Sequence, residues 1–180
     1  MRIDWEKVQY DLQYIILNCI ANKIPSWTIR RAIYVRSGMQ LGKGSRIGIN
    51  TVVVCPQNIK ISSGTIVNEN CVLDGRGRLT IGRDTSISMY SKILSASHKL
   101  DSPVFEYCVK KTTIGNNVWT GTSAVILDGS KIGDFAVVGA NSVVKGAVAE
   151  KSVMIGNPAR EIKKRSVENR YCLNFKAYFR

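Results

Sequence analysis

Residues 114–148 read IGNNVW TGTSAV ILDGSK IGDFAV VGANSV VKGAV when they are divided into groups of six. An aliphatic or β-branched residue opens every group, and a small or β-branched residue stands four positions later. A period of six matches neither an amphipathic helix nor a long strand, but it is typical of parallel β-helices. The opening residues are Ile114, Thr120, Ile126, Ile132, Val138 and Val144. The residues four positions after them are Val118, Ala124, Ser130, Ala136, Ser142 and Val148.

The same period runs through residues 41–97, with two short insertions near residues 57–60 and 75–80. Each group of six would supply one short strand and one corner, and three groups would close one coil of a triangular prism. Small residues fit the corners, where Gly or Asn supplies the backbone angles of the turn. We therefore predict an all-β fold, a left-handed parallel β-helix of about five to six coils. An ordinary β-sandwich is the alternative, but it gives no reason for so long an unbroken register.

The prediction divides the chain into three parts. Residues 1–40 form an N-terminal helical cap, because apolar residues from Trp5 to Ile20 recur at helical spacing and Pro25 ends that helix. Residues 41–160 form the β-helix, with a loop at 98–112 where the period breaks. Residues 161–180 form a short, basic C-terminal extension, which we interpret as a second cap or a subunit contact.

The composition restricts the possible functions less than the repeat restricts the fold. The chain has 180 residues, 44% hydrophobic residues and a net charge of +13, which favours attraction to phosphorylated ligands, anionic membranes or nucleic acid. Its five cysteines are widely spaced and lack a Cys-x-x-Cys pair, so we expect reduced thiols. We find no apolar stretch of roughly 20 residues and no export signal. We expect a cytoplasmic protein, with contact between the N-terminal helix and the inner membrane face as a further possibility.

His98 is the only histidine, and it stands where the long break in the period begins. A single histidine excludes metal sites made of three histidines, including that of the β-helical zinc carbonic anhydrases. A single histidine is more often incidental than catalytic, but loops on a rigid scaffold are where chemistry is expected. Histidine is also the residue type whose ordinary pKa suits proton transfer near neutral pH. We interpret His98 as a candidate general base.

Four runs of sequence resemble the hexapeptide-repeat acyltransferases. These are ASHKLD at 96–101, TIGNNVWTG at 113–121, VGANSVV at 138–144 and IGNPAR at 155–160. Galactoside and maltose O-acetyltransferases and the acetyltransferases of bacterial surface polysaccharides are nearest in pattern. The resemblance covers residues 41 to 163, and residues 24–39 look more like the polysaccharide-modifying branch.

The resemblance implies an acetyl-CoA-dependent O-acetyltransferase that acts on a sugar or polysaccharide hydroxyl. We expect no metal, and no nucleic acid as partner because the sequence has no nucleic-acid-binding motif. The resemblance also implies a homotrimer with each site in a groove between neighbouring prisms. His98 matches the catalytic histidine, which Asp101 or Glu106 could orient. The expected coenzyme A contacts are Trp119, for which we favour a packing role, the backbone at Thr122 and Ala140, and the cations Lys145, Arg160 and Lys163; the expected acceptor contacts are Asn68 and Asp74.

Some features depart from the family pattern. Thr120 replaces an aliphatic residue, Asp128 and Ser130 replace more usual turn residues, and the spacing between Asn68 and Asp74 is one residue short. The N-terminal helix lacks the acidic and arginine pattern of the small-sugar acetyltransferases, which argues against galactoside or maltose as acceptor. Alternatives are an acyl carrier protein or longer acyl-CoA as donor, an amine acceptor, or a non-catalytic β-helix that binds polyanions.

Overall fold

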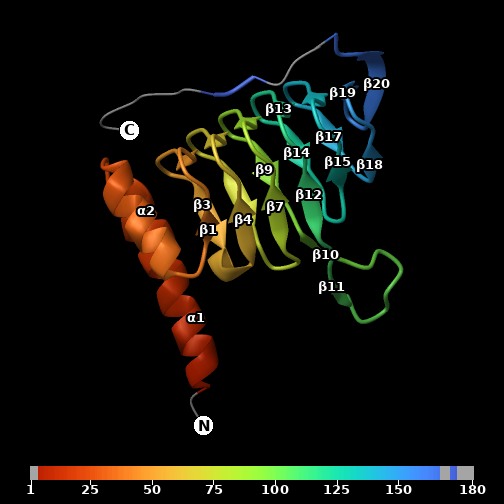
Figure 1. The fold of residues 1–180 in the computed structure, drawn as a ribbon. Helices are drawn as coiled ribbons and strands as arrows, with labels where there is room; N and C mark the ends of the chain where they lie inside the picture. Colours follow the sequence, from red (N-terminus) through yellow and green to blue (C-terminus); the bar gives the residue numbers. More distant parts are fainter. Residues whose placement is uncertain (1–3, 167–170, 174–180) are drawn as a thin grey trace.

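The computed structural model describes residues 4–166 and 171–173. Its strands stack side by side along one axis and form three sheets, in which every strand except β20 is parallel to its neighbours (Figure 1). Sheet A contains β1 (Gln40–Leu41), β4 (Ile59–Ile61), β7 (Leu79–Ile81), β12 (Thr112–Ile114), β15 (Lys131–Ile132) and β18 (Ala147–Val148). Sheet B contains β2 (Arg46–Ile47), β5 (Ile66–Val67), β8 (Ser86–Ile87), β13 (Trp119–Thr120), β16 (Val137–Val138), β19 (Ser152–Gly156) and β20 (Ala159–Lys164). Sheet C contains β3 (Val52–Val54), β6 (Val72–Asp74), β9 (Lys92–Ile93), β14 (Val125–Ile126) and β17 (Val143–Val144).

The chain visits the three sheets in a fixed order. It completes five circuits of A, B and C strands and then adds β18 and β19, which confirms the predicted coil number. Each circuit turns three corners, which we name AB, BC and CA after the sheets they join. Because parallel neighbours lie about 4.8 Å apart, side chains at one corner form a column along the axis.

The first and fifth residues of each group of six face the interior, as predicted. Ile61, Ile81 and Ile114 occupy consecutive coils in register and are at most 3% exposed. The small residues at the corners are buried too, and their hydroxyl groups bond to carbonyls of the next coil, as Thr85 Oγ1 does to Gly115 O at 2.8 Å. Polar corner residues are therefore compatible with a buried position, because their hydrogen bonds are satisfied.

The glycines that follow the opening residues have a different role from the one expected. Left-handed angles occur at Asn50, Asn70 and Asn117, whereas Gly121 has no positive φ. A Cβ atom added to Gly121 would lie 2.5 Å from Ala140 N in the next coil. Close approach of neighbouring coils, rather than turn geometry, requires glycine there.

A helical segment closes the N-terminal end of the prism. It comprises α1 (Trp5–Ile15), a π-helical turn (Ile16–Ile20), a 3-10 turn (Ala21–Lys23) and α2 (Trp27–Arg36). The Asn18 side chain forms the two hydrogen bonds that a neighbouring strand would form: it accepts from Val53 N at 2.8 Å and donates to Val53 O at 3.0 Å. The buried Arg30 donates to Ile47 O at 2.9 Å. Both contacts satisfy backbone groups on the open edge of the first coil.

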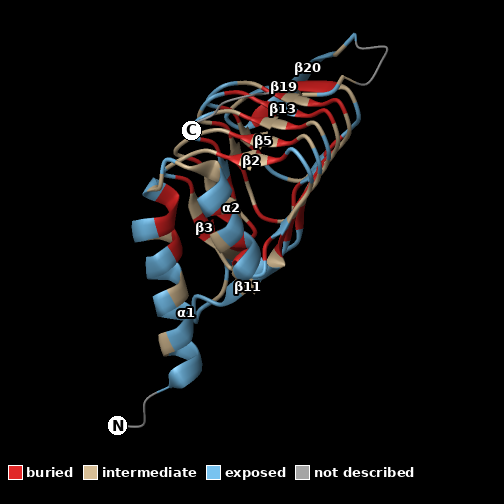
Figure 2. Cartoon of the chain, turned by 60° about the vertical axis from the view of Figure 1, so that its left-hand side comes forward, coloured by how far each residue is buried: buried red, intermediate tan, exposed pale blue. Residues whose placement is uncertain are grey.

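The helical segment differs from the prediction in two ways. The second helix, α2, was not expected. The first helix, α1, has no buried residue and extends beyond the prism, as the exposed colouring in Figure 2 shows. Trp5 and Leu12 on it are 72% and 54% exposed. No described helix is long and apolar enough to cross a membrane.

The insertions in the period lie at the CA corner. The first is a 3-10 turn at Pro56–Asn58, the second is a turn at 75–78, and the longest forms an antiparallel hairpin of β10 (Ala96–His98) and β11 (Tyr107–Val109) that projects from the prism (Figure 1). At the other end β20 folds back antiparallel on β19. Of the extension 161–180, residues 167–170 and 174–180 lie outside the described part of the chain.

Candidate active site

His98 ends strand β10 and lies opposite Tyr107 of β11. Its Nδ1 atom is 2.8 Å from Phe105 O, and its ring stacks on the Phe105 ring with centroids 3.7 Å apart and an interplanar angle of 14°. A carbonyl oxygen only accepts hydrogen bonds, so Nδ1 must carry the proton. Nε2 of the neutral ring is then left as a proton acceptor, which is the form that a general base requires.

A hollow of about 540 Å³ opens beside this imidazole. Most of its lining comes from the hairpin, and Lys110 and Lys145 contribute from the CA corner. Of the two carboxylates expected to orient His98, Glu106 pairs with Lys99 at 2.6 Å, and Asp101 lines the hollow. The Phe105 carbonyl, not a carboxylate, is therefore the group that orients the ring.

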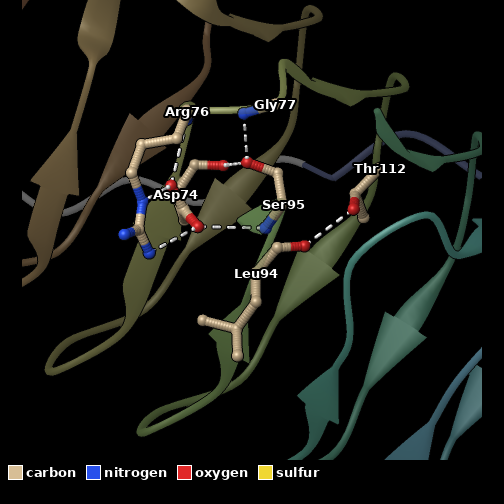
Figure 3. A network of polar contacts seen from close by, with 6 residues as sticks. All are labelled: Asp74, Arg76, Gly77, Leu94, Ser95 and Thr112. Carbon is tan, nitrogen blue, oxygen red and sulfur yellow. Dashed lines mark hydrogen bonds and ion pairs between the residues drawn. The ribbon is translucent and has the colours of Figure 1, made fainter. Parts of the chain in front are cut away.

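The base of the hairpin is fixed to the preceding coil through Asp74 (Figure 3). Asp74 Oδ2 accepts from Ser95 N at 3.0 Å, and Ser95 Oγ donates to Asp74 O at 2.7 Å. Ser95 Oγ also accepts from Gly77 N at 2.8 Å, and Lys110 N donates to Ser95 O at 2.9 Å. Ser95 precedes His98 by three residues, so these bonds restrain both chain segments where they leave the prism.

Asp74 is charged inside this network. Its side chain is 1% exposed, and Arg76 donates to it from Nε at 2.9 Å and from Nη2 at 3.1 Å. Burial by itself would raise the pKa of this carboxyl, but hydrogen bonds from the Arg76 side chain and from the Arg76 and Ser95 amides, with the Arg76 charge, lower its pKa below the usual value. The carboxylate is therefore the stable form of the hairpin anchor.

The residues expected to bind the pantetheine arm lie at another corner. Thr122 and Ala140 follow β13 and β16 and stack at the BC corner, where Asn141 N donates to Thr122 O at 2.9 Å. Trp119 on β13 is 49% exposed, and its Nε1 donates to Ser88 Oγ at 3.2 Å. The structure thus brings Trp119, Thr122 and Ala140 together along one face, but at a different corner from His98.

The three cations that we expect to contact coenzyme A are divided between two places. Lys145 follows β17 at the CA corner and lines the hollow of His98. Arg160 and Lys163 lie on β20 at the end of sheet B, and both are exposed. Lys145 therefore lies on a different part of the prism from Arg160 and Lys163.

The two expected acceptor residues are also separated. Asn68 lies at the BC corner and donates from Nδ2 to Ile87 O at 2.9 Å. Asp74 lies at the CA corner, where its two side-chain oxygens are already hydrogen bonded. Contact between Asp74 and an acceptor would require breaking those bonds, so its acceptor role remains a prediction.

Sequence reasoning missed the aromatic residues that hold His98. Phe105 stacks on the ring, and Tyr107 meets it edge-on with centroids 5.6 Å apart. The available signal was the presence of two aromatic residues close after the histidine in the same insertion. Ser95 was missed as the hairpin anchor because serine at a corner also fits the repeat. Among the described residues no group of three or more His, Cys, Asp or Glu side chains is arranged to hold a metal ion.

Comparison with known sequences agrees with this geometry. The family model described as bacterial transferase hexapeptide (six repeats) matches residues 111–146. A relative from Escherichia coli (strain K12), named as the lipopolysaccharide biosynthesis O-acetyl transferase WbbJ, is 31% identical over 160 residues. That alignment covers 79% of this chain and 81% of the relative, so the similarity extends well beyond the segment that the family model matches.

Solved structures show the same architecture. A hexapeptide-repeat acetyltransferase from Vibrio cholerae O1 biovar eltor, complexed with acetyl-CoA, superimposes with a TM-score of 0.82 and 30% identity over 90% of each chain. A maltose O-acetyltransferase from Clostridium difficile 630 superimposes with a TM-score of 0.83 and 26% identity, over 91% of this chain and 90% of that one. The predicted β-helix is confirmed, and the similarity includes the coils on both sides of the hairpin.

Proposed function

Since this chain belongs to the bacterial hexapeptide-repeat transferases, and its named relatives are acetyltransferases, we propose that it transfers acetyl from acetyl-CoA to a sugar or surface-polysaccharide hydroxyl, with His98 as general base. The observation that carries this proposal is the bond between His98 Nδ1 and Phe105 O. It leaves Nε2 as the only ring atom able to accept a proton, beside a hollow of about 540 Å³.

The proposed chemistry needs one base and a polarised thioester. His98 Nε2 accepts the proton of the acceptor hydroxyl as its oxygen bonds to the thioester carbon. The carbon–sulfur bond then breaks, and the imidazolium returns its proton to the leaving thiolate. Backbone amides along the coil edge would stabilise the negative charge on the thioester oxygen. The Phe105 carbonyl would stabilise the imidazolium through the Nδ1 proton.

The names of the relatives support the proposed class of acceptor. One relative is named for lipopolysaccharide biosynthesis and one structural neighbour for maltose, so both names refer to glycans. A hydroxyl acceptor also matches the O-acetyl transfer in both names. We therefore place a glycan hydroxyl, rather than an amine, beside His98.

The proposed enzyme is a homotrimer, and the division of the site between corners supports it. His98 and Lys145 lie at the CA corner, whereas Trp119, Thr122 and Ala140 lie on or near the BC corner of the same prism. If the CA corner of one subunit met the BC corner of the next, each interface would contain one complete site. Such a head-to-tail contact closes into a ring of three when each subunit is rotated by a third of a turn from the last.

The principal test is the release of coenzyme A thiol from acetyl-CoA in the presence of a panel of sugars and glycans. We expect His98→Ala to lower turnover by a factor of about 10² to 10⁴ with little change in coenzyme A affinity. His98→Gln is the matched control for folding, because it retains a polar side chain of similar reach. Release only with amines, or only from longer acyl donors, would overturn the acceptor or donor assignment. Coenzyme A binding without transfer to any acceptor would overturn the enzyme assignment.

The shared site has its own test. His98→Ala removes one half of each site, and Ala140→Glu obstructs the other half. Each variant alone should retain at most about a hundredth of the activity. Coexpression of the two should restore about a quarter of the activity, because random mixing leaves that fraction of interfaces with two intact halves. No recovery in mixed oligomers would argue that one chain supplies the whole site.

A further inference from the structure

A second hollow, of about 300 Å³, lies over the first strands of sheet A, outside the site described above. Three cationic side chains line it: Lys60 on β4, Arg78 immediately before β7 and Lys111 immediately before β12. Gln40, Gln57, Asn58 and Thr80 add groups that can donate hydrogen bonds, and none of the lining residues is acidic.

The fold forces two of these cations together. Thr112 pairs with Leu79 in the parallel register, and Thr112 N donates to Arg78 O at 3.0 Å, so Lys111 lies directly beside Arg78 on the adjacent coil. Like charges at neighbouring positions of a sheet are destabilising. Lys60, Arg78 and Lys111 are all exposed, and none of them forms an ion pair within the described part of the chain. Their mutual repulsion is therefore not relieved by the protein itself.

The hollow is next to the hairpin that carries His98. Strand β11 ends at Val109, and the two residues that follow separate: Lys110 lines the hollow of His98, and Lys111 lines the cationic hollow. An acceptor bound with its hydroxyl at His98 can therefore extend past β11 and contact sheet A.

We propose that the cationic hollow, formed by Lys60, Arg78 and Lys111, binds a phosphate or diphosphate group of the acceptor. A phosphate carries about −1.5 to −2 charges at pH 7. Three cations and several amide donors match this charge better than they would match the single charge of a carboxylate. This inference rests on the proposed function, because it assigns the acceptor to phosphate-bearing sugars such as a sugar diphosphate.

The test compares two variants with the same loss of charge. One carries Lys60→Gln, Arg78→Asn and Lys111→Gln; Asn is chosen because residue 78 has a φ of 74°, which asparagine tolerates. The control carries Lys43→Gln, Lys92→Gln and Lys131→Gln, exposed cations that do not line the hollow. The first probe is inorganic pyrophosphate, titrated at low ionic strength because salt screens exposed charges.

We expect the hollow variant to bind pyrophosphate at least tenfold more weakly, and the control variant to stay within twofold of the unmodified protein. Equal weakening in both variants would reduce the effect to net charge and overturn the proposal. Weakened acetyl-CoA binding in the hollow variant alone would assign the cations to the donor instead, and would also overturn it.

A second measurement separates this inference from the proposed function. With a nucleoside diphosphate sugar as acceptor, the hollow variant should show a raised KM and an unchanged kcat. With a neutral sugar as acceptor, both constants should be unchanged. If transfer proceeds but no diphosphate acceptor distinguishes the two variants, the phosphate site fails and the transferase assignment stands. If pyrophosphate binding depends on the hollow but no acceptor is acetylated, the binding site stands and the transferase assignment fails.

Discussion

The anchor of the hairpin that carries His98 can be tested by Asp74→Asn, which removes the buried charge and keeps the shape. Asp74 accepts two backbone hydrogen bonds, from Arg76 N and Ser95 N, both at 3.0 Å, and pairs with an Arg76 side chain that is 40% exposed. The amide of asparagine can accept only one of the backbone bonds and faces the other donor with its own N–H. A hydrogen bond to a charged group contributes about 1.5–3 kcal/mol, and the half-exposed Arg76 pair adds less than about 1 kcal/mol after solvent screening.

From these contributions we expect the unfolding free energy to fall by about 2–3 kcal/mol, or about 4–12 °C in melting temperature for a chain of this length. Turnover, measured well below the melting transition, should fall about 10- to 100-fold, because a displacement of the base by about 1 Å has effects of that size. The KM for acetyl-CoA should not change.

The control is Asp134→Asn, which removes a similar carboxylate from the AB corner. Asp134 accepts from Asn116 N at 2.8 Å and from Asn116 Nδ2 at 2.9 Å, at a different corner from the hairpin. We expect a smaller loss of stability than for Asp74→Asn, because Asp134 is only half-buried, and an unchanged turnover. If both variants lose turnover equally, or neither does, Asp74 does not position His98.

The effect on stability should also depend on pH. Because the pKa of Asp74 is lowered in the folded protein, its contribution is complete above the unfolded value of about 3.9 and is lost as pH falls through the folded value. The stability difference between the unmodified protein and Asp74→Asn should therefore be largest near neutral pH and should shrink below about pH 4. A difference that stays constant down to pH 2 would contradict the assignment of a charged Asp74.

Three further predictions concern the donor contact and the fold. Arg160→Ala should weaken binding of coenzyme A more than that of dephospho-coenzyme A in a calorimetric titration, and equal losses would exclude a contact with the 3′-phosphate. Gly121→Ala should destabilise the prism by about 1–3 kcal/mol in chemical denaturation, since its Cβ would lie 2.5 Å from Ala140 N, and a neutral effect would mean that the coils separate easily. Asn18→Leu should cost about 2–3 kcal/mol by leaving both backbone groups of Val53 unpaired, whereas Gln9→Leu on the exposed helix should change stability little.

Much of the architecture follows from the sequence because its cause is local. A residue such as Ile126 must face inward whenever the chain turns every six residues, so the period by itself defines the strands, the corners and the number of coils. The break at residue 98 is visible for the same reason, since an insertion interrupts a strict register. The second helix was not visible, because its face is selected by the open edge that it covers rather than by its own periodicity. Arg30 illustrates this. Arginine usually lies at the surface, yet Arg30 is fully buried, where it donates a hydrogen bond to Ile47 O on the open edge of the first coil.

The candidate site divides along the same line. The sequence by itself identified His98, because it is the only histidine and stands at the break, and it placed Trp119, Thr122 and Ala140 on the coils. Only the tertiary structure decided what His98 contacts, since Phe105 belongs to an insertion without a repeat, and what anchors the hairpin, since Asp74 bonds to Ser95 in the next coil. It also decided that His98 lies at a different corner of the prism from Thr122 and Ala140. A periodic sequence specifies interactions between equivalent positions of adjacent coils, whereas contacts made by an insertion depend on where its residues lie in space.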